Sequence, residues 1–156
     1  RYTVSPYGLI WNSENYYLVA FEEGKGMRHY RVDKMTSIAL LDQPRLGREE
    51  FDPQKMRDYA KPMFGMFGGP VSRVELRCDN SVIGPMLDRF GTGVTILPQP
   101  DGWFTLYADV VVSPPFFGWL CGFGGRVELV SPAAARDQLR QTLETISAAY
   151  QTKEQA

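Results

Sequence analysis

The order of strand-like and helix-like segments between residues 71 and 130 constrains the fold of this chain more than any other sequence feature. In the strand-like segments, apolar side chains either alternate with polar ones or form short runs rich in branched and aromatic residues. The helix-like segments end at glycine. In chain order we predict a strand at 71–78, a helix at 80–90, strands at 94–97 and 103–112, a helix at 115–123 and a strand at 126–130. This β-α-β-β-α-β order predicts a ferredoxin-like domain.

A further helix is predicted after residue 131. Ser131 is a suitable cap, and Pro132 is favourable at the first helical position. The apolar side chains that follow are spaced four, three and four residues apart, which places them in one stripe. They are Leu139, Leu143, Ile146 and Tyr150. We expect the stripe to pack on the sheet or on a partner chain.

The first part of the chain reads as an antiparallel meander. Strand-like segments at 2–11, 16–21 and 27–41 are separated by turn-forming residues at 12–15 and 22–26. The last segment is long enough for one bent strand or two. The prediction is a small antiparallel sheet or barrel, which makes the whole chain α+β.

A polar region with one helix-like piece separates these halves. Asp52 followed by Pro53 predicts a helix over residues 53–60 that ends before Pro62. The compact apolar stretch at 63–69 is where we place the boundary. The predicted domains are residues 1–42, a linker with a short helix at 43–70, and residues 71–156.

Alternation along the third segment predicts a locally basic strip. Tyr30 and Val32 share the face assigned to the core, and the opposite face presents an imidazole, a guanidinium and a carboxylate. The members of the strip are His29, Arg31 and Asp33, flanked by Arg28 and Lys34. On the second segment, Tyr16 and Leu18 are assigned to the core and Tyr17 to the opposite face.

Composition limits the function. The formal net charge of −1 leaves nucleic-acid binding to a local basic patch, and no apolar run approaches the length that spans a membrane. Cys78 and Cys121 are expected to be buried free thiols. With His29 the only histidine, no metal or cofactor site is predicted. No nucleophile accompanied by a base is visible, so we do not expect an enzyme.

Three ordered blocks resemble the WYL domain: residues 5–9, then Tyr16-Tyr17-Leu18, then residues 28–35 with the pattern arginine, aromatic, arginine, aliphatic, aspartate, basic. Tyr16 stands where that family's name has Trp. Residues 74–77, 118–120 and 126–132, with the terminal helix, resemble the carboxy-terminal extension called WCX. The resemblance implies a small Sm-like, SH3-type barrel whose opening helix and first strand lie upstream of Arg1. The chain is therefore expected to be a fragment of a longer bacterial regulator, which begins in mid-strand.

The resemblance also implies a function. WYL regulators are cytoplasmic, carry an amino-terminal helix-turn-helix that binds operator DNA, and sense an effector for which an oligonucleotide or nucleotide-like ligand is the best-supported class. The candidate contacts are Arg28, Arg31 and Lys34 for phosphate, Tyr7 and Tyr17 for base stacking, and His29, with Arg77 and Arg126 as a second contribution. Three alternatives stay open: Asp33 pairs with Arg31 or Lys34 on a solvated strand, the effector is a small molecule, or the region is a constitutive homodimerisation module.

Overall fold

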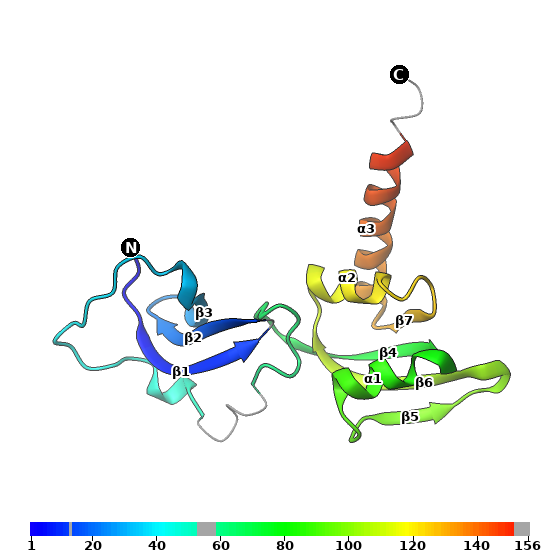
Figure 1. Ribbon diagram of the computed structural model, residues 1–156, viewed down its shortest axis with the longest axis horizontal. Coiled ribbons are helices and arrows are strands. Elements are labelled where there is room, and N and C mark those ends of the chain that lie inside the picture. The colour runs from blue at the N-terminus through cyan, green and yellow to red at the C-terminus, as the bar shows by residue number, and fades with distance from the viewer. Residues whose placement is uncertain (13, 53–58, 152–156) are drawn as a thin grey trace. The chain divides into compact units, whose positions relative to one another are not determined.

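The computed structural model describes residues 1–12, 14–52 and 59–151 of the chain (Figure 1). By its internal contacts the chain divides into two compact units, Arg1–Gly68 and Gly69–Ala156. The polar stretch at residues 43–52 and the apolar stretch at 59–68 therefore go with the first unit. Each unit is built around its own antiparallel sheet, and the fold is α+β as predicted.

The sheet of the first unit is a three-stranded meander, which confirms the predicted order. Its strands are β1 (Ser5–Asn12), β2 (Asn15–Glu22) and β3 (Gly26–Arg31), with β2 in the centre. A register shift between Pro6 and Gly8 interrupts the pairing of β1 with β2. In its described part the unit presents this one open sheet, so a closed Sm-like barrel stays a prediction.

The third strand is much shorter than predicted. Instead of extending to residue 41, β3 ends at Arg31, and Val32–Lys34 form a 3-10 turn in which the Met35 N–H donates to the Val32 carbonyl. The Arg31 side chain bonds Asp33, the middle residue of this turn, and the backbone leaves the extended conformation at Val32. The expectation that Val32 and Asp33 continue the strand alternation was wrong for this reason.

The core of the first unit is centred on β2. Val19 and Ala20 are both fully buried although they point to opposite faces, so both faces of β2 are covered. Buried Met63, Phe64 and Met66 add apolar volume. Tyr16, which we assigned to the core, is instead 55% exposed.

Residues 45–51 run beside the sheet and are fastened to β1. The Leu46 N–H donates to Ser5 Oγ at 2.8 Å, and Arg45 Nη1 donates to the Pro6 carbonyl at 3.1 Å. Gly47 adopts φ of +76° directly against the Phe21 ring, just before a 3-10 turn at Arg48–Glu50. The helix predicted over residues 53–60 falls largely on 53–58, which lie outside the described residues; Tyr59 and Ala60 are in a turn.

The second unit contains the predicted succession of strands and helices, with boundaries shifted by three residues at most. Its elements are β4 (Val71–Asp79), α1 (Ile83–Phe90, preceded by a 3-10 turn), β5 (Thr95–Pro98), β6 (Trp103–Val111), α2 (Pro114–Cys121), β7 (Val127–Ser131) and α3 (Ala133–Gln151). The sheet order is β5-β6-β4-β7, with all neighbours antiparallel.

Alternation on β4 separates the core of this unit from its solvent face. Val74 and Leu76 are fully buried, whereas Arg73 and Arg77 on either side of this pair are exposed. Buried side chains of the two short helices complete the core; the main ones are Met86, Phe116, Phe117 and Leu120. The Ser113 hydroxyl caps α2 by accepting the Phe116 N–H.

The two thiols of this unit have different environments. Cys78 is buried on β4, and its burial raises the pKa of the thiol to about 12. Cys121 is free and exposed at the end of α2, so the prediction of two buried thiols was correct only for Cys78.

Helix α3 follows β7 and extends away from it (Figure 1). Leu139 is half-buried, but Leu143, Ile146 and Tyr150 are 46%, 49% and 78% exposed. The sheet therefore covers only the beginning of the predicted apolar stripe. None of the helices in the described part of the chain is long and apolar enough to cross a membrane.

Candidate functional site

The basic residues of β3 lie on two faces of the first sheet. Arg28 is opposite Ala20 on β2, and Arg31 is opposite Tyr17. The two arginines are three positions apart along the strand, so they point to opposite sides of the sheet. Because β3 is an edge strand of this sheet, both faces are joined around its free edge. A ligand that contacts both arginines must cross that edge.

The exposed cations of the strip are Arg28 and Lys34. The charge of Arg28 contributes to a lowered pKa at Glu22, although the Lys25 ammonium and the Tyr30 hydroxyl, which bond that carboxylate directly, are the larger causes. Lys34 has 72% of its side chain exposed and lies 3.9 Å from Asp33 Oδ2. Both cations are therefore accessible to an incoming anion.

Arg31 is held in a fixed position by three hydrogen bonds. Its Nε donates to Asp33 Oδ1 at 2.9 Å, and its Nη2 donates to Asp33 Oδ2 at 2.8 Å and to Asn15 Oδ1 at 2.7 Å. The hydrogen bond raises the pKa of Arg31 and lowers the pKa of Asp33. The structure thus contains the Arg31–Asp33 pair that we weighed as an alternative to ligand binding.

His29 is half-buried rather than open to solvent. Its Nε2 lies 3.2 Å from Tyr59 Oη, and the two rings meet edge to face with centroids 5.5 Å apart. Burial lowers the pKa of His29, and a hydrogen bond with the backbone of Met66 acts in the opposite direction. The imidazole ring of His29 therefore contacts both Tyr59 and Met66.

The two tyrosines assigned to base stacking differ in availability. Tyr7 donates its hydroxyl to the Leu46 carbonyl at 2.6 Å, stacks on Phe51 with centroids 4.7 Å apart, and has Arg45 over its ring. Its ring is therefore occupied by the chain itself. Tyr17 is half-buried beside Arg31 on one face of the sheet.

Sequence reasoning missed an exposed pair of rings in this unit. Trp11 and Tyr16 face each other across the β1–β2 hairpin with centroids 4.7 Å apart, and they are 60% and 55% exposed. Leu9, two residues before Trp11, is 62% exposed. The clue in the sequence was the aromatic residue on each side of the turn, which the assignment of Tyr16 to the core obscured.

The arginines proposed as a second contribution lie in the other unit and are engaged there. Arg77 Nη1 donates to Glu128 Oε2 at 3.1 Å while its guanidinium lies 4.1 Å from the Trp103 ring centroid. Arg126 Nε donates to the Phe123 carbonyl at 3.1 Å. Both side chains remain at the surface.

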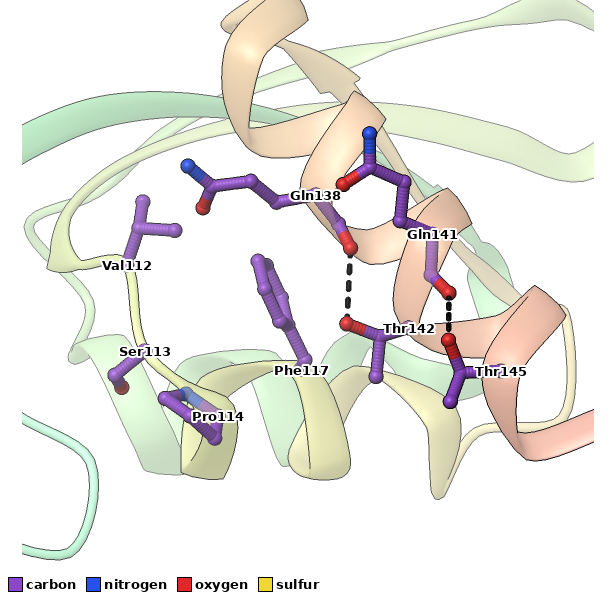
Figure 2. A pocket seen from close by; sticks show the side chains of 8 residues that line it. All are labelled: Val112, Ser113, Pro114, Phe117, Gln138, Gln141, Thr142 and Thr145. Atoms are coloured by element: carbon purple, nitrogen blue, oxygen red, sulfur yellow. Dashed lines mark hydrogen bonds between the residues drawn. The ribbon is translucent and has the colours of Figure 1, made fainter. Parts of the chain in front are cut away.

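A shallow depression of about 360 Å³, wide open to solvent, lies between the start of α2 and α3 within the second unit (Figure 2). Phe117, Val112 and Pro114 supply its apolar side, and the facing side carries carboxamides and hydroxyls. These polar residues are Gln138, Gln141, Thr142 and Thr145, with Ser113 at the helix start. The two threonine hydroxyls donate to the carbonyls of Gln138 and Gln141 at 2.9 Å. This lining is uncharged and so suits a neutral ligand better than a phosphate.

Comparison with known families agrees with this division of the chain. The WYL domain matches residues 1–40, and the WCX domain matches residues 70–147. The chain therefore belongs to the proteins in which a WYL domain is followed by a WCX domain. This pair makes it a WYL/WCX regulator region.

This chain is similar to two solved structures. Proteasome accessory factor B/C (PafBC) of Arthrobacter aurescens aligns over 87% of this chain with 23% identity and a TM-score of 0.37. A CRISPR Cas-related protein aligns over 96% with 16% identity and a TM-score of 0.47. This chain spans 21% and 43% of those chains, so neither likeness assigns a role to a residue. No curated protein matches it significantly.

Proposed function

We propose that this chain is the effector-sensing and dimerisation region of a bacterial, cytoplasmic transcriptional regulator, and that it has no enzymatic activity. Its effector is an oligonucleotide or nucleotide-like ligand bound by the first unit. Operator DNA is contacted by a helix-turn-helix domain elsewhere in the same protein. The finer fold we propose is an Sm-like barrel for the WYL part and a ferredoxin-like domain for the WCX part.

The observation that carries this proposal is the combination of exposed cations and exposed rings on one small sheet and the turn that follows β3. Arg28 and Lys34 offer charge to phosphates, and Trp11 and Tyr16 offer ring faces to bases. Stacking of one base on an aromatic side chain contributes about 1–3 kcal/mol. A single strand suits the arrangement because it is flexible enough to pass around the edge of β3, whereas a duplex is stiff over this length.

Within this proposal the predicted contacts take different roles. Arg28 and Lys34 bind phosphate directly, and Arg31 does so after exchanging Asp33 for the ligand. Tyr17 contacts the part of the ligand that lies on the Arg31 face. Tyr7 supports the site by fixing residues 45–51 against β1, because its hydroxyl and ring are already engaged.

Fluorescence anisotropy with a labelled eight-nucleotide single-stranded DNA, titrated at 50 and 200 mM salt, tests the proposal. Removing one phosphate contact in Arg28→Ala should weaken binding and reduce the salt slope by about 1. Arg140→Ala is the matched control, because Arg140 is an exposed arginine of α3 in the other unit. Absence of binding at low salt would refute the proposal that the effector is a nucleic acid.

The uncharged pocket between α2 and α3 favours a second candidate function, the sensing of a neutral small molecule. Phe117, Val112 and Pro114 give it an apolar side, and its carboxamides can donate and accept hydrogen bonds. A thermal shift caused by a neutral compound and abolished by Gln138→Ala, with oligonucleotide binding absent, would make this the leading function. Unchanged stability with every compound would count against it.

Homodimerisation is proposed to use the outer half of α3. Its apolar stripe, Leu143, Ile146 and Tyr150, is exposed over a helix whose later turns contact little else in the described chain. Light scattering after size exclusion should give twice the chain mass, and Ile146→Glu should give the monomer. A monomeric wild type at micromolar concentration would refute this assignment.

A further inference from the structure

Residues 59–68 form a packed segment of the first unit. Met63, Phe64 and Met66 are 8%, 6% and 5% exposed, and the segment folds through two turns, in which the Met63 N–H donates to the Ala60 carbonyl and the Phe67 N–H donates to the Phe64 carbonyl. The segment ends at the boundary between the units. Any change in its packing therefore occurs immediately before the chain enters the second unit.

His29 is the polar residue of β3 that holds this segment. Its Nε2 is 3.2 Å from Tyr59 Oη at one end of the segment, and its ring is hydrogen-bonded to the backbone of Met66 near the other end. The ring also lies against Gly68, where a Cβ atom would be 3.6 Å from His29 Cε1. The His29 side chain thus contacts Tyr59 at the start of the segment, Met66 near its end, and Gly68 at the boundary between the two units.

The neutral imidazole fits these partners. With Nε2 accepting from the Tyr59 hydroxyl, Nδ1–H is left to donate to the Met66 carbonyl. Burial lowers the pKa of His29 and raises the pKa of Tyr59, so the histidine stays neutral and the tyrosine keeps its proton at neutral pH. A protonated ring would place a charge in this half-buried contact, at a cost in desolvation.

The charged and titratable groups around the ring are few in the described part of the chain. Arg28, the preceding residue, disfavours a second positive charge on His29. Arg31 lies two residues further on the same face but is neutralised by Asp33. Tyr59 is the titratable group that the segment places against the ring, and Lys61 of the segment is exposed.

We propose that His29 is a positioning residue that latches residues 59–68 onto β3 and couples ligand occupancy of Arg28 to the segment entering the second unit. This coupling rests on the proposed function, because it assigns a regulatory consequence to the same basic strip. A bound anion neutralises Arg28 and so removes a charge that opposes protonation of His29 in the latched state. The pKa of latched His29 then lies closer to that of the open state, so protonation opens the segment less and the ligand holds the latch closed at low pH.

The sign of the pH dependence follows from the direction of the shift. Because the pKa of His29 in the latched state lies below its ordinary value of 6.5, the open state binds the proton more readily. The latch is at full strength above about pH 6.5 and weakens as the pH falls toward the latched pKa. At low pH, the ratio of open to latched molecules rises about tenfold for each unit by which the pKa of His29 in the open state exceeds its pKa in the latched state.

Proton NMR of the single imidazole measures the latch directly, because His29 is the only histidine of the chain. In the full chain its resonance should titrate below 6.5, and Tyr59→Phe should raise that pKa by removing the donor to Nε2. Tyr150→Phe, which removes an exposed tyrosine hydroxyl from α3, should leave it unchanged. A titration at 6.5 in the wild type would overturn the latch whether or not an oligonucleotide binds.

Hydrogen exchange of residues 59–68 measures the coupling. After correction for intrinsic exchange, the wild type should exchange faster at pH 5.5 than at pH 7.5, and His29→Gln should exchange fast at both. Arg28→Ala, which imitates neutralisation by a ligand, should raise the pKa of His29 and slow exchange of the segment at pH 5.5. If Arg28→Ala changes neither quantity, the coupling is wrong even where an octamer of deoxythymidine binds.

Discussion

Gly47 offers the sharpest test of how residues 45–51 pack on the first sheet. Its backbone has φ of +76°, and a Cβ atom added there would lie 2.2, 2.3 and 2.7 Å from three carbons of the Phe21 ring. Carbon atoms in favourable contact are about 3.5–4.0 Å apart, so Gly47→Ala forces the ring or the segment to move by roughly 1 Å. Gly24 has the same φ of +76° with nothing within 4 Å of its added Cβ atom, which makes Gly24→Ala the matched control.

The two substitutions separate backbone strain from steric conflict. The left-handed conformation costs a non-glycine residue about 1–2 kcal/mol, and both variants lose this amount. Overpacking adds about 1–3 kcal/mol and applies only at Gly47. We therefore expect Gly24→Ala to destabilise the first unit by about 1–2 kcal/mol and Gly47→Ala by about 2–5 kcal/mol.

Urea denaturation followed by tryptophan fluorescence measures the difference. Trp11 is the only tryptophan of the first unit, so a background with Trp103→Phe and Trp119→Phe makes the signal specific for that unit. Combining Gly47→Ala with Phe21→Ala should recover part of the loss, because the ring that opposes the methyl group is gone. Equal destabilisation by Gly47→Ala and Gly24→Ala would refute the packing of Gly47 on Phe21.

Three further outcomes are expected in the second unit. One thiol per folded chain, Cys121, should react quickly with an aromatic disulfide at pH 8, and the second should react only after unfolding, because burial raises the pKa of Cys78 to about 12; two fast thiols would contradict this. Leu76→Ala should cost about 2–5 kcal/mol in thermal or urea unfolding, since Leu76 is fully buried, and a loss below 1 kcal/mol would argue against the core. Ser113→Ala should cost about 0.5–2 kcal/mol by removing the cap of α2, whereas unchanged stability would show that the cap contributes little.

The second unit could be predicted from sequence because its signals are local. Alternation over Val74 and Leu76 located a strand with one buried face, and Gly91 marked the end of α1 where the structure has it. Each of these features is decided within a few residues. The sheet order depends on pairings between strands distant in the sequence, β4 with β6 and β4 with β7.

The first unit was less predictable because its decisive contacts are not local in sequence. His29 meets Tyr59 thirty residues away, and Tyr7 donates to Leu46 thirty-nine residues away. Alternation correctly put His29 and Arg31 on one face, but it could not show that β3 ends at Arg31 or that Asp33 turns back to it. Tyr16 was misplaced because an aromatic residue in a strand was taken as buried, although its partner Trp11 leaves both rings exposed.

The Arg31–Asp33 pair has a consequence for how strongly and how selectively the strip can hold an anion. Asp33 is a competitor tethered two residues from the guanidinium, present at a high effective concentration whatever the solution contains. A weakly held monovalent anion gains nothing by replacing it, whereas a ligand already anchored at Arg28 or Lys34 can exchange with it. Arg31 then binds only a ligand that Arg28 or Lys34 already holds. It therefore discriminates between a free ion and a ligand carrying several linked phosphates.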